Sequence, residues 1–209
     1  MRCLYCDSPI NKITIYSALF DEDMLCVNCR DAMKVKRTIS KVEGVEVESF
    51  YDYDSLFKSM LIQYKECFDE ALKDVFLYKI KYYIKLRYLD YKIIYMPSST
   101  SKLELRGFNH LKLMFEPLEF KEVEGLRYKQ ELIQEGKNRQ QRKQMRDNFI
   151  YEGKRENKVL LVDDVMTTGS SVLGAYEAIK PYCNKCKVLV LAKKENAFID
   201  RQKNAIISL

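Results

Sequence analysis

Four of the seven cysteines in this 209-residue chain form two pairs with the spacing of metal ligands. The pairs are Cys3 with Cys6 and Cys26 with Cys29, each with two residues between its thiols. Two such pairs can place four thiolates at the corners of a tetrahedron and complete a Zn(Cys)4 site without an open position. The spacing therefore predicts structural Zn²⁺ in a zinc ribbon or finger over residues 1–36, a segment with too little core to fold without metal. A redox dithiol, or unpaired thiols, is the alternative.

A third pair, Cys183 and Cys186, repeats the spacing but has no second pair to complete a site. It lies between a predicted helix and a predicted strand. We interpret it as part of a turn with small apolar packing, and not as a second metal site.

The segment Asp163–Ser171 brings acidic, hydroxyl and glycine residues directly after the short apolar strand Val159–Val162. Ligands of open α/β sheets bind at the carboxyl ends of strands. A turn of Thr, Gly and Ser that opens a helix offers backbone N–H groups, hydroxyl donors and the positive end of the helix dipole, which suits a terminal phosphate. Gly169 lets the backbone approach such a group closely or adopt a positive φ.

The two aspartates of this segment need a different partner, because carboxylates repel a phosphate. Asp163 and Asp164 can accept hydrogen bonds from vicinal sugar hydroxyls or help to hold a hydrated Mg²⁺. A phosphate cradle beside a diol acceptor describes a ribose 5-phosphate site. The alternative is an ordinary helix N-cap with acidic residues near the helix dipole.

The elements that must position this segment follow an alternating pattern. Helical spacing of apolar residues predicts helices at 54–89, 108–115 and 170–180, between short apolar strands at 93–96, 159–162 and 187–192. Such strands indicate an α/β fold with a parallel sheet covered on both faces.

Three other stretches are less regular. Residues 42–51 alternate as a strand or an extended linker, and residues 98–107 indicate a polar loop. Tyrosines and lysines interleave over 51–95. The plain interpretation is packed tyrosines with solvated lysines, and the alternative is bases stacked over a basic groove.

Composition narrows the class of protein. The chain is 47% hydrophobic and 32% charged, with a formal net charge of +6 that permits an anionic partner without requiring one. No apolar run approaches the length of a transmembrane helix, and the N-terminus lacks the apolar core of a secretory signal. An odd number of cysteines argues against a disulfide framework. We expect one sizeable domain, residues 37–209, behind the cysteine module.

The run VLLVDDVMTTGSS, residues 159–171, resembles the phosphoribosyl pyrophosphate (PRPP) signature of type I phosphoribosyltransferases. The cysteine module, this run and three further motifs occur in an order that resembles the ComF family of competence proteins over nearly the whole chain. The further motifs are Met96-Pro97-Ser98, Arg106-Gly107-Phe108-Asn109, and Gln130 with Arg139, Arg142, Arg146 and Asn148. The family joins a zinc finger to a phosphoribosyltransferase-like domain and is associated with DNA uptake in natural transformation.

The resemblance implies roles for individual residues. Asp163 and Asp164 would bind the ribose hydroxyls, and Arg106, in a pyrophosphate loop over 98–106, would neutralise the leaving group. Gln130 and the basic run Lys137–Arg146 would belong to a flexible loop over the site. The ligand contacts as a set would be Asp163, Asp164, Val165, Met166, Thr167, Thr168, Gly169, Ser170 and Ser171.

His110, the single histidine, follows Asn109 where the family usually has another polar residue. We interpret it as surface or loop packing, and not as an acid or base.

Three functions remain open at this point. The first is a competence protein that binds single-stranded DNA, a PRPP-like ligand, or both, on a phosphoribosyltransferase scaffold. The second is an active phosphoribosyltransferase that uses PRPP and Mg²⁺ with an unidentified acceptor. The third is a zinc-ribbon adaptor for a DNA helicase or translocase. For all three we expect a cytoplasmic protein, either free or at the inner face of the membrane.

Overall fold

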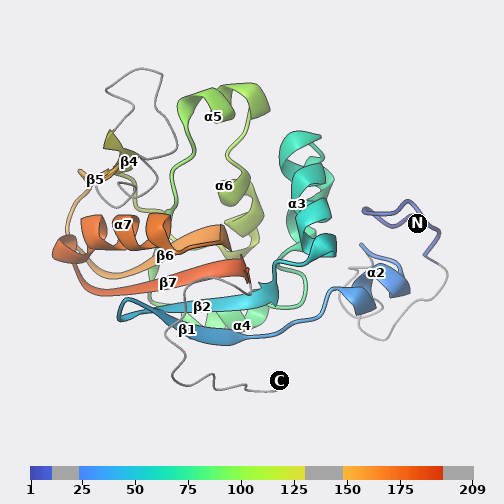
Figure 1. The fold of residues 1–209 in the computed structure, drawn as a ribbon, viewed down its shortest axis with the longest axis horizontal. Coiled ribbons are helices and arrows are strands. Elements are labelled where there is room, and N and C mark those ends of the chain that lie inside the picture. Colours follow the sequence, from blue (N-terminus) through green and yellow to red (C-terminus); the bar gives the residue numbers. More distant parts are fainter. Residues whose placement is uncertain (11–23, 130–147, 195–209) are drawn as a thin grey trace.

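A five-stranded, mostly parallel sheet organises the chain in the computed structural model, which describes residues 1–10, 24–129 and 148–194 (Figure 1). The strand order is β1-β2-β7-β6-β3. Only the pairing of β1 with β2 is antiparallel among these strands. The bounds are Thr38–Val42 for β1, Val45–Asp52 for β2, Lys92–Tyr95 for β3, Glu156–Met166 for β6 and Cys183–Lys193 for β7. The α/β class with a mainly parallel sheet is therefore confirmed.

The central strand β6 is longer than the apolar run that predicted it. Val159–Val162 is fully buried, as expected of a strand covered on both faces. The strand then continues through the two aspartates to Met166, because Asp163 and Val165 still pair with Val190 and Ala192 of β7. The strand is therefore longer than the predicted 159–162, and the chain leaves the sheet only after Met166.

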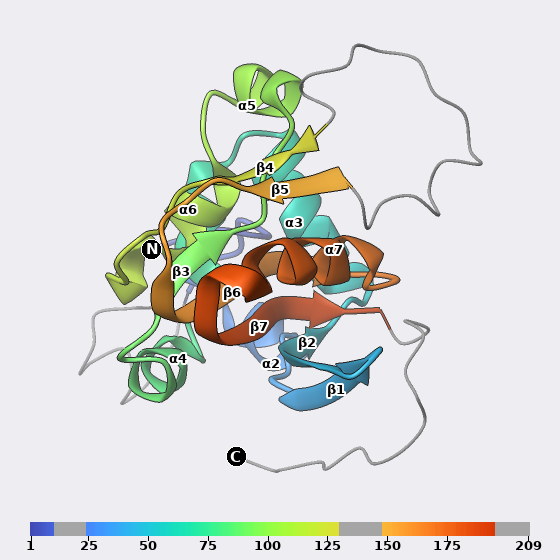
Figure 2. The same cartoon turned by 90° about the vertical axis from the view of Figure 1, so that its left-hand side faces the viewer.

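Helices cover both faces of the sheet. Helices α3 (Ser55–Glu66), α4 (Lys81–Arg87) and α6 (His110–Phe115) contact one face, since Glu48 of β2 reaches α4 and Asp164 of β6 reaches α3 and α6. Glu48 and Asp164 share a face because the register pairs Glu48 with Leu189 and Leu189 with Val162. Helix α7 (Ser170–Ile179) lies on the other side of the sheet from α4 (Figure 2).

The helical region predicted over 54–89 is interrupted. After α3 the chain forms a 3₁₀ helix, η1 (Glu70–Val75), before α4. The carboxylate of Asp54 caps α3 by accepting from the Phe57 N–H at 2.8 Å. Tyrosines of the region, Tyr64 and Tyr88 among them, are buried in the core, which confirms the packing interpretation for those residues.

The polar loop predicted over 98–107 is wrong. Residues Thr100–Arg106 form helix α5, which ends at Gly107 with φ of 76°. The run contains leucines, lysine, glutamate and arginine, all good helix formers, and the left-handed glycine accommodates the helix end. Gly107 N–H donates to Leu103 O at 2.8 Å and closes that end.

Two hairpin-like pairings complete the fold. The predicted strand or linker over 42–51 is the hairpin of β1 and β2, whose turn residues Glu43 and Gly44 both have positive φ. A separate two-stranded sheet pairs β4 (Leu126–Tyr128) with β5 (Phe149–Tyr151) and packs against α7. Short 3₁₀ helices follow α6 and α7, η2 (Glu116–Leu118) and η5 (Lys180–Tyr182).

The pair Cys183 and Cys186 opens strand β7, so the turn predicted for it is wrong. Cys183 is buried, and its thiol donates to Ile179 O at 3.7 Å. The expected small apolar packing is therefore present, but in a strand.

The described part of the cysteine module contacts helix α3 and the segment just before α4. Its helix α2 (Val27–Ala32) is held at its carboxyl end by Lys79, whose ammonium donates to Arg30 O at 2.7 Å and to Met33 O at 2.8 Å. Tyr5 OH donates to Ser59 Oγ on α3 at 3.1 Å. Among the described helices, none is both long and apolar enough to cross a membrane.

Candidate functional site

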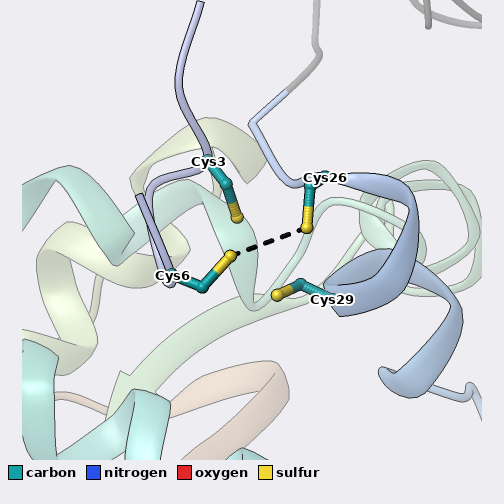
Figure 3. A group of neighbouring side chains, drawn as sticks. All are labelled: Cys3, Cys6, Cys26 and Cys29. Atoms are coloured by element: carbon teal, nitrogen blue, oxygen red, sulfur yellow. Dashed lines mark hydrogen bonds between the residues drawn. The ribbon is translucent and has the colours of Figure 1, made fainter. Parts of the chain in front are cut away.

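The four predicted metal ligands meet at one point, with all their sulfur atoms within 4.8 Å of one another (Figure 3). Tetrahedral Zn–S bonds of about 2.3 Å place sulfur atoms about 3.8 Å apart, and Cys6 Sγ lies 3.6 Å from Cys26 Sγ. Cys3, Cys26 and Cys29 are buried, whereas Cys6 is exposed. This group can hold a metal ion, and its donor set and spacing fit zinc.

Local backbone structure brings the two pairs together. The first pair lies in a short bridged turn, in which Arg2 pairs with Pro9 and Asp7 N–H donates to Cys3 O at 2.9 Å. The second pair opens α2, with Cys26 at its N-cap. The first pair lies in a turn and the second at the start of a helix. Two intervening residues are therefore enough to direct both thiols of each pair toward one centre.

The hydroxyl residues of the second predicted site lie where β6 passes into α7. Thr167 and Thr168 are exposed, and Ser170 and Ser171 are half-buried in the first turn of the helix. Thr168 Oγ1 donates to Ser170 Oγ at 3.3 Å. First-turn N–H groups have no partner inside a helix, so this turn has the composition of an anion cradle at the carboxyl end of a parallel strand.

Gly169 is required at this turn for two reasons. Its φ is +80°, a left-handed conformation that side chains disfavour. A Cβ at this position would lie 2.8 Å from Cγ1 of Val42 in the β1–β2 hairpin. The turn is therefore pressed against the hairpin, which fixes its path.

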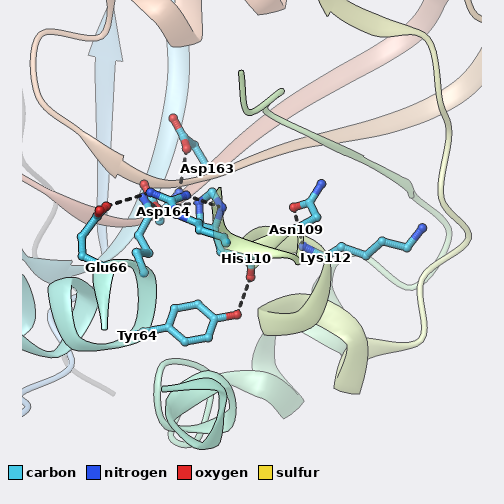
Figure 4. Close-up of polar contacts among 9 residues, drawn as sticks. Tyr64, Glu66, Asn109, His110, Lys112, Asp163 and Asp164 are labelled. Atoms are coloured by element: carbon cyan, nitrogen blue, oxygen red, sulfur yellow. Dashed lines mark hydrogen bonds and ion pairs between the residues drawn. The ribbon is translucent and has the colours of Figure 1, made fainter. Parts of the chain in front are cut away.

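Asp164 is paired within the protein. Its Oδ2 atom accepts a hydrogen bond from Lys65 Nζ of α3, and His110 Nε2 of α6 lies 2.9 Å from the same oxygen (Figure 4). Burial raises the pKa of Asp164, but the His110 hydrogen bond and the positive charge of Lys65 outweigh that effect and hold it well below its ordinary value. The carboxylate is a buried, ionised and internally paired group.

Asp163 has the opposite environment. It points to the other face of β6, is half-buried, and accepts from the Asp164 backbone N–H at 2.9 Å through Oδ1. Burial first, and then the neighbouring Asp164 charge, raise the pKa of Asp163 above its ordinary value. Of the two aspartates, only Asp164 is hydrogen-bonded to Lys65 and His110.

Arg106 lies in the same network as Asp164. It belongs to the last turn of α5, and its side chain is only 5% exposed. Its guanidinium donates to Glu66 Oε1 at 2.8 Å and lies 3.4 Å from His110 Nδ1. The predicted leaving-group cation is therefore held between Glu66 and His110.

His110 is buried, so the interpretation as a surface residue is wrong. Burial lowers the pKa of His110 more than contact with Asp164 raises it, so the ring is neutral at pH 7. Tyr64 OH donates to His110 O at 2.8 Å and anchors the start of α6. Lys65 and Glu66 also belong to the site and were not predicted, since charged residues on an amphipathic helix carry no local signal of a distant partner.

A cavity of about 310 Å³ lies at the carboxyl end of β3, beside the segment predicted to bind pyrophosphate. Its lining includes Met96, Pro97, Ser98 and Thr100, together with Glu124 and Arg127. Its lining does not include Asp163–Ser171. Gln130 and Lys137–Arg146 lie outside the described residues.

Comparison with known proteins gives one informative relative. No family model matches the chain. The chain is 26% identical over 199 residues to "Competence protein ComFC" of Streptococcus pneumoniae strain ATCC BAA-255 / R6, an alignment that covers 82% of this chain and 90% of the relative. The alignment extends over most of both proteins, and the cysteine cluster and the mainly parallel sheet occur where the resemblance in the sequence places them. This similarity to a ComFC protein over most of the chain supports the resemblance to the ComF family.

Proposed function

We propose that the chain is a competence protein that acts in DNA uptake, and that its sheet domain binds the ribose 5-phosphate part of a PRPP-like ligand. The relative that aligns with most of the chain is named a competence protein. The observation that carries the ligand proposal is the turn between β6 and α7. It combines two exposed threonines, two half-buried serines and a left-handed glycine at the carboxyl end of a parallel strand.

The two aspartates have separate roles in this proposal. Asp163 accepts hydrogen bonds from the vicinal hydroxyls of the pentose. Asp164 stays paired with Lys65 and His110 and holds the end of β6 in place. Mg²⁺ enters as the counter-ion of the diphosphate, and no ligand of that ion is assigned to the chain.

Transfer chemistry is the second candidate, and the position of Arg106 favours it. Departure of pyrophosphate from the sugar leaves an oxocarbenium-like centre and places negative charge on the leaving oxygens. A cation beside those oxygens stabilises that charge. Arg106 lies one hydrogen-bonded residue away from Asp164, so it is near the aspartate pair.

The proposal also includes a structural zinc ion at the four cysteines and single-stranded DNA as the macromolecular ligand. The net charge of +6 and the name of the relative support the DNA part. A helicase or translocase partner stays a prediction.

The experiment that tests the ligand proposal is calorimetric titration of the full chain with PRPP and Mg²⁺, repeated with a single-stranded oligonucleotide present. We expect Asp163→Asn and Thr168→Val each to weaken PRPP binding. Lys158→Gln, which alters an exposed ion pair with Asp90, is the control that should leave it unchanged. Unchanged PRPP affinity in both site variants would overturn the assignment.

Two further readouts separate the parts of the proposal. Oligonucleotide binding that weakens as salt rises supports contact with the nucleic-acid backbone, and no binding at low salt removes the DNA part. Release of pyrophosphate in the presence of an acceptor panel would establish the transferase. Binding without release would leave a ligand-binding competence protein.

A further inference from the structure

The hydrogen-bonding capacities of its neighbours specify one form of the His110 ring. Arg106 Nη1 lies 3.4 Å from His110 Nδ1, and a guanidinium can only donate, so Nδ1 must accept. Asp164 Oδ2 lies 2.9 Å from His110 Nε2, and an ionised carboxylate can only accept, so Nε2 must carry the proton and donate. The contacts therefore define the neutral Nε2–H tautomer.

We infer that His110 is a positioning residue that joins Arg106 to Asp164, and so couples the diphosphate side of the site to the pentose side. The inference deepens the proposed function and rests on it for the identity of the ligand. The hydrogen-bond arrangement itself belongs to the ligand-free chain and can be tested without any ligand.

Burial makes this arrangement specific. The side chains of His110, Asp164 and Arg106 are 7%, 9% and 5% exposed, respectively. Hydrogen bonds in such surroundings are electrostatically stronger than in water, and a buried polar group that loses its partner is costly. A change at either end is therefore transmitted to the ring.

The charged neighbours around the ring come from three elements besides α6. Lys65 and Glu66 extend from α3, Arg106 from α5, and Asp163 and Asp164 from β6. Lys65 shares Oδ2 of Asp164 with His110, and Glu66 shares the guanidinium of Arg106 with His110. The ring is thus the middle member of a chain of contacts with an acid–base pair at each end.

A diphosphate at the end of α5 would compete with His110 and Glu66 for the guanidinium of Arg106. If Arg106 turns to the ligand, Nδ1 loses its donor and the tautomer is no longer defined from that side. Ribose 5-phosphate, which lacks the diphosphate, leaves the Arg106 contact in place. PRPP should therefore change the ring environment more than ribose 5-phosphate does.

The first test uses the fact that the chain has a single histidine. Long-range ¹H–¹⁵N spectra of the uniformly labelled full chain at neutral pH contain the ring nitrogens of His110 alone. We expect the Nε2–H tautomer in the free protein, a shift of the Nδ1 resonance in Arg106→Gln, and no shift in the matched control Arg155→Gln. Arg155 is exposed and contacts Asn184. An Nδ1–H tautomer, a charged ring, or an unshifted Nδ1 in Arg106→Gln overturns the inference.

The second test separates positioning from packing. His110→Gln keeps one hydrogen-bond donor and one acceptor on an amide without a ring, whereas His110→Phe keeps a ring and loses both hydrogen bonds. We expect His110→Phe to weaken PRPP binding by about tenfold or more, the loss typical of a hydrogen bond to a charged group, and His110→Gln to restore most of it. The reverse order, with Phe tolerated and Gln harmful, shows that the ring only fills space and overturns the inference.

The two tests keep this inference distinct from the proposed function. If the wild-type chain binds neither PRPP nor ribose 5-phosphate, the proposed ligand is wrong, and the coupling of its two halves falls with it. The tautomer measurement still decides whether Arg106, His110 and Asp164 form one hydrogen-bonded unit.

Discussion

The four-cysteine module and the carboxyl end of β6 are both polar centres, but the residues that form them are separated by different distances along the chain. Cys6 and Cys26 are 20 residues apart and belong to two short knuckles. Lys65 and Asp164 are 99 residues apart, and His110 and Asp164 are 54 apart. The four cysteines come together through local turns, whereas the network around Asp164 exists only once α3, α5, α6 and β6 are all packed.

The comparison predicts that the module fails when its metal is lost. Changing both Cys3 and Cys6 to Ser removes half of the ligands, and metal binding by structural zinc peptides contributes about 10–16 kcal/mol of folding free energy. We expect zinc content to fall from about one ion per chain to near zero, measured by elemental analysis. Amide exchange should rise in residues 1–10 and 24–36 while the sheet stays protected. Full zinc content in the double variant would show that the metal lies elsewhere; the pair Cys183→Ala with Cys186→Ala is the control.

The network around Asp164 should instead fail through the whole domain. Lys65→Met leaves the buried carboxylate without its ammonium partner, and breaking a buried pair by removing one member costs about 3–5 kcal/mol. Urea denaturation of the full chain measures this loss. Lys158→Met, at an exposed pair, should cause little change. Equal effects of the two substitutions would mean that the Lys65 pair adds nothing beyond a surface contact.

The turn at Gly169 tests how tightly the site is pressed against the β1–β2 hairpin. Gly169→Ala combines an unfavourable φ with a contact of 2.8 Å to Val42, and we expect a loss of about 2–4 kcal/mol in the free energy of unfolding. Gly44→Ala has a similar φ of +84° and no atom within 4 Å of the new Cβ, so it measures the conformational part alone, about 1–2 kcal/mol. Equal losses would show that the hairpin yields without cost.

The smallest expected effect concerns Asp163 and pH. Folding raises the pKa of Asp163 above its ordinary value of 3.8, so the folded chain binds this proton more tightly than the unfolded chain. The stability contributed by the protonated carboxyl is complete below that ordinary value and is lost as pH rises through the raised pKa. Asp163→Asn removes this loss of stability. The melting temperature of the variant, relative to that of the wild type at the same pH, should therefore rise between pH 5 and pH 8. A difference between the two proteins that does not change with pH would contradict the raised pKa.

Local signals account for what the sequence predicted. The cysteine spacing predicted the cluster, and continuous apolar runs at Val159–Val162 and 187–192 predicted buried parallel strands. The Thr, Gly and Ser run marked the turn before α7. Each of these depends on residues within a few positions of one another.

The errors arose where distant partners decide the structure. Asp163 and Asp164 look like the start of a loop, yet pairing with β7 keeps them in the strand. His110 looks like a surface residue, yet Asp164 from β6 and Arg106 from α5 satisfy both ring nitrogens in the interior. A polar side chain can be buried when each of its hydrogen-bonding atoms has a partner. A single sequence does not show which partners the fold will supply. The ligand roles of Arg106 and of Asp163–Ser171 stay predictions.

The order of strands in the sheet has a consequence for synthesis of the chain. Val47 of β2 pairs with Val188 of β7, a separation of 188 − 47 = 141 residues. At roughly 5–20 residues per second, the ribosome needs about 7–28 s to supply the neighbour of β2 after β2 itself has been made. During that interval the apolar face of the hairpin has no sheet to join, so the nascent chain exposes an unpaired strand edge that chaperones can recognise. The four cysteines are all made after 29 residues, so a metal ion could bind them long before then.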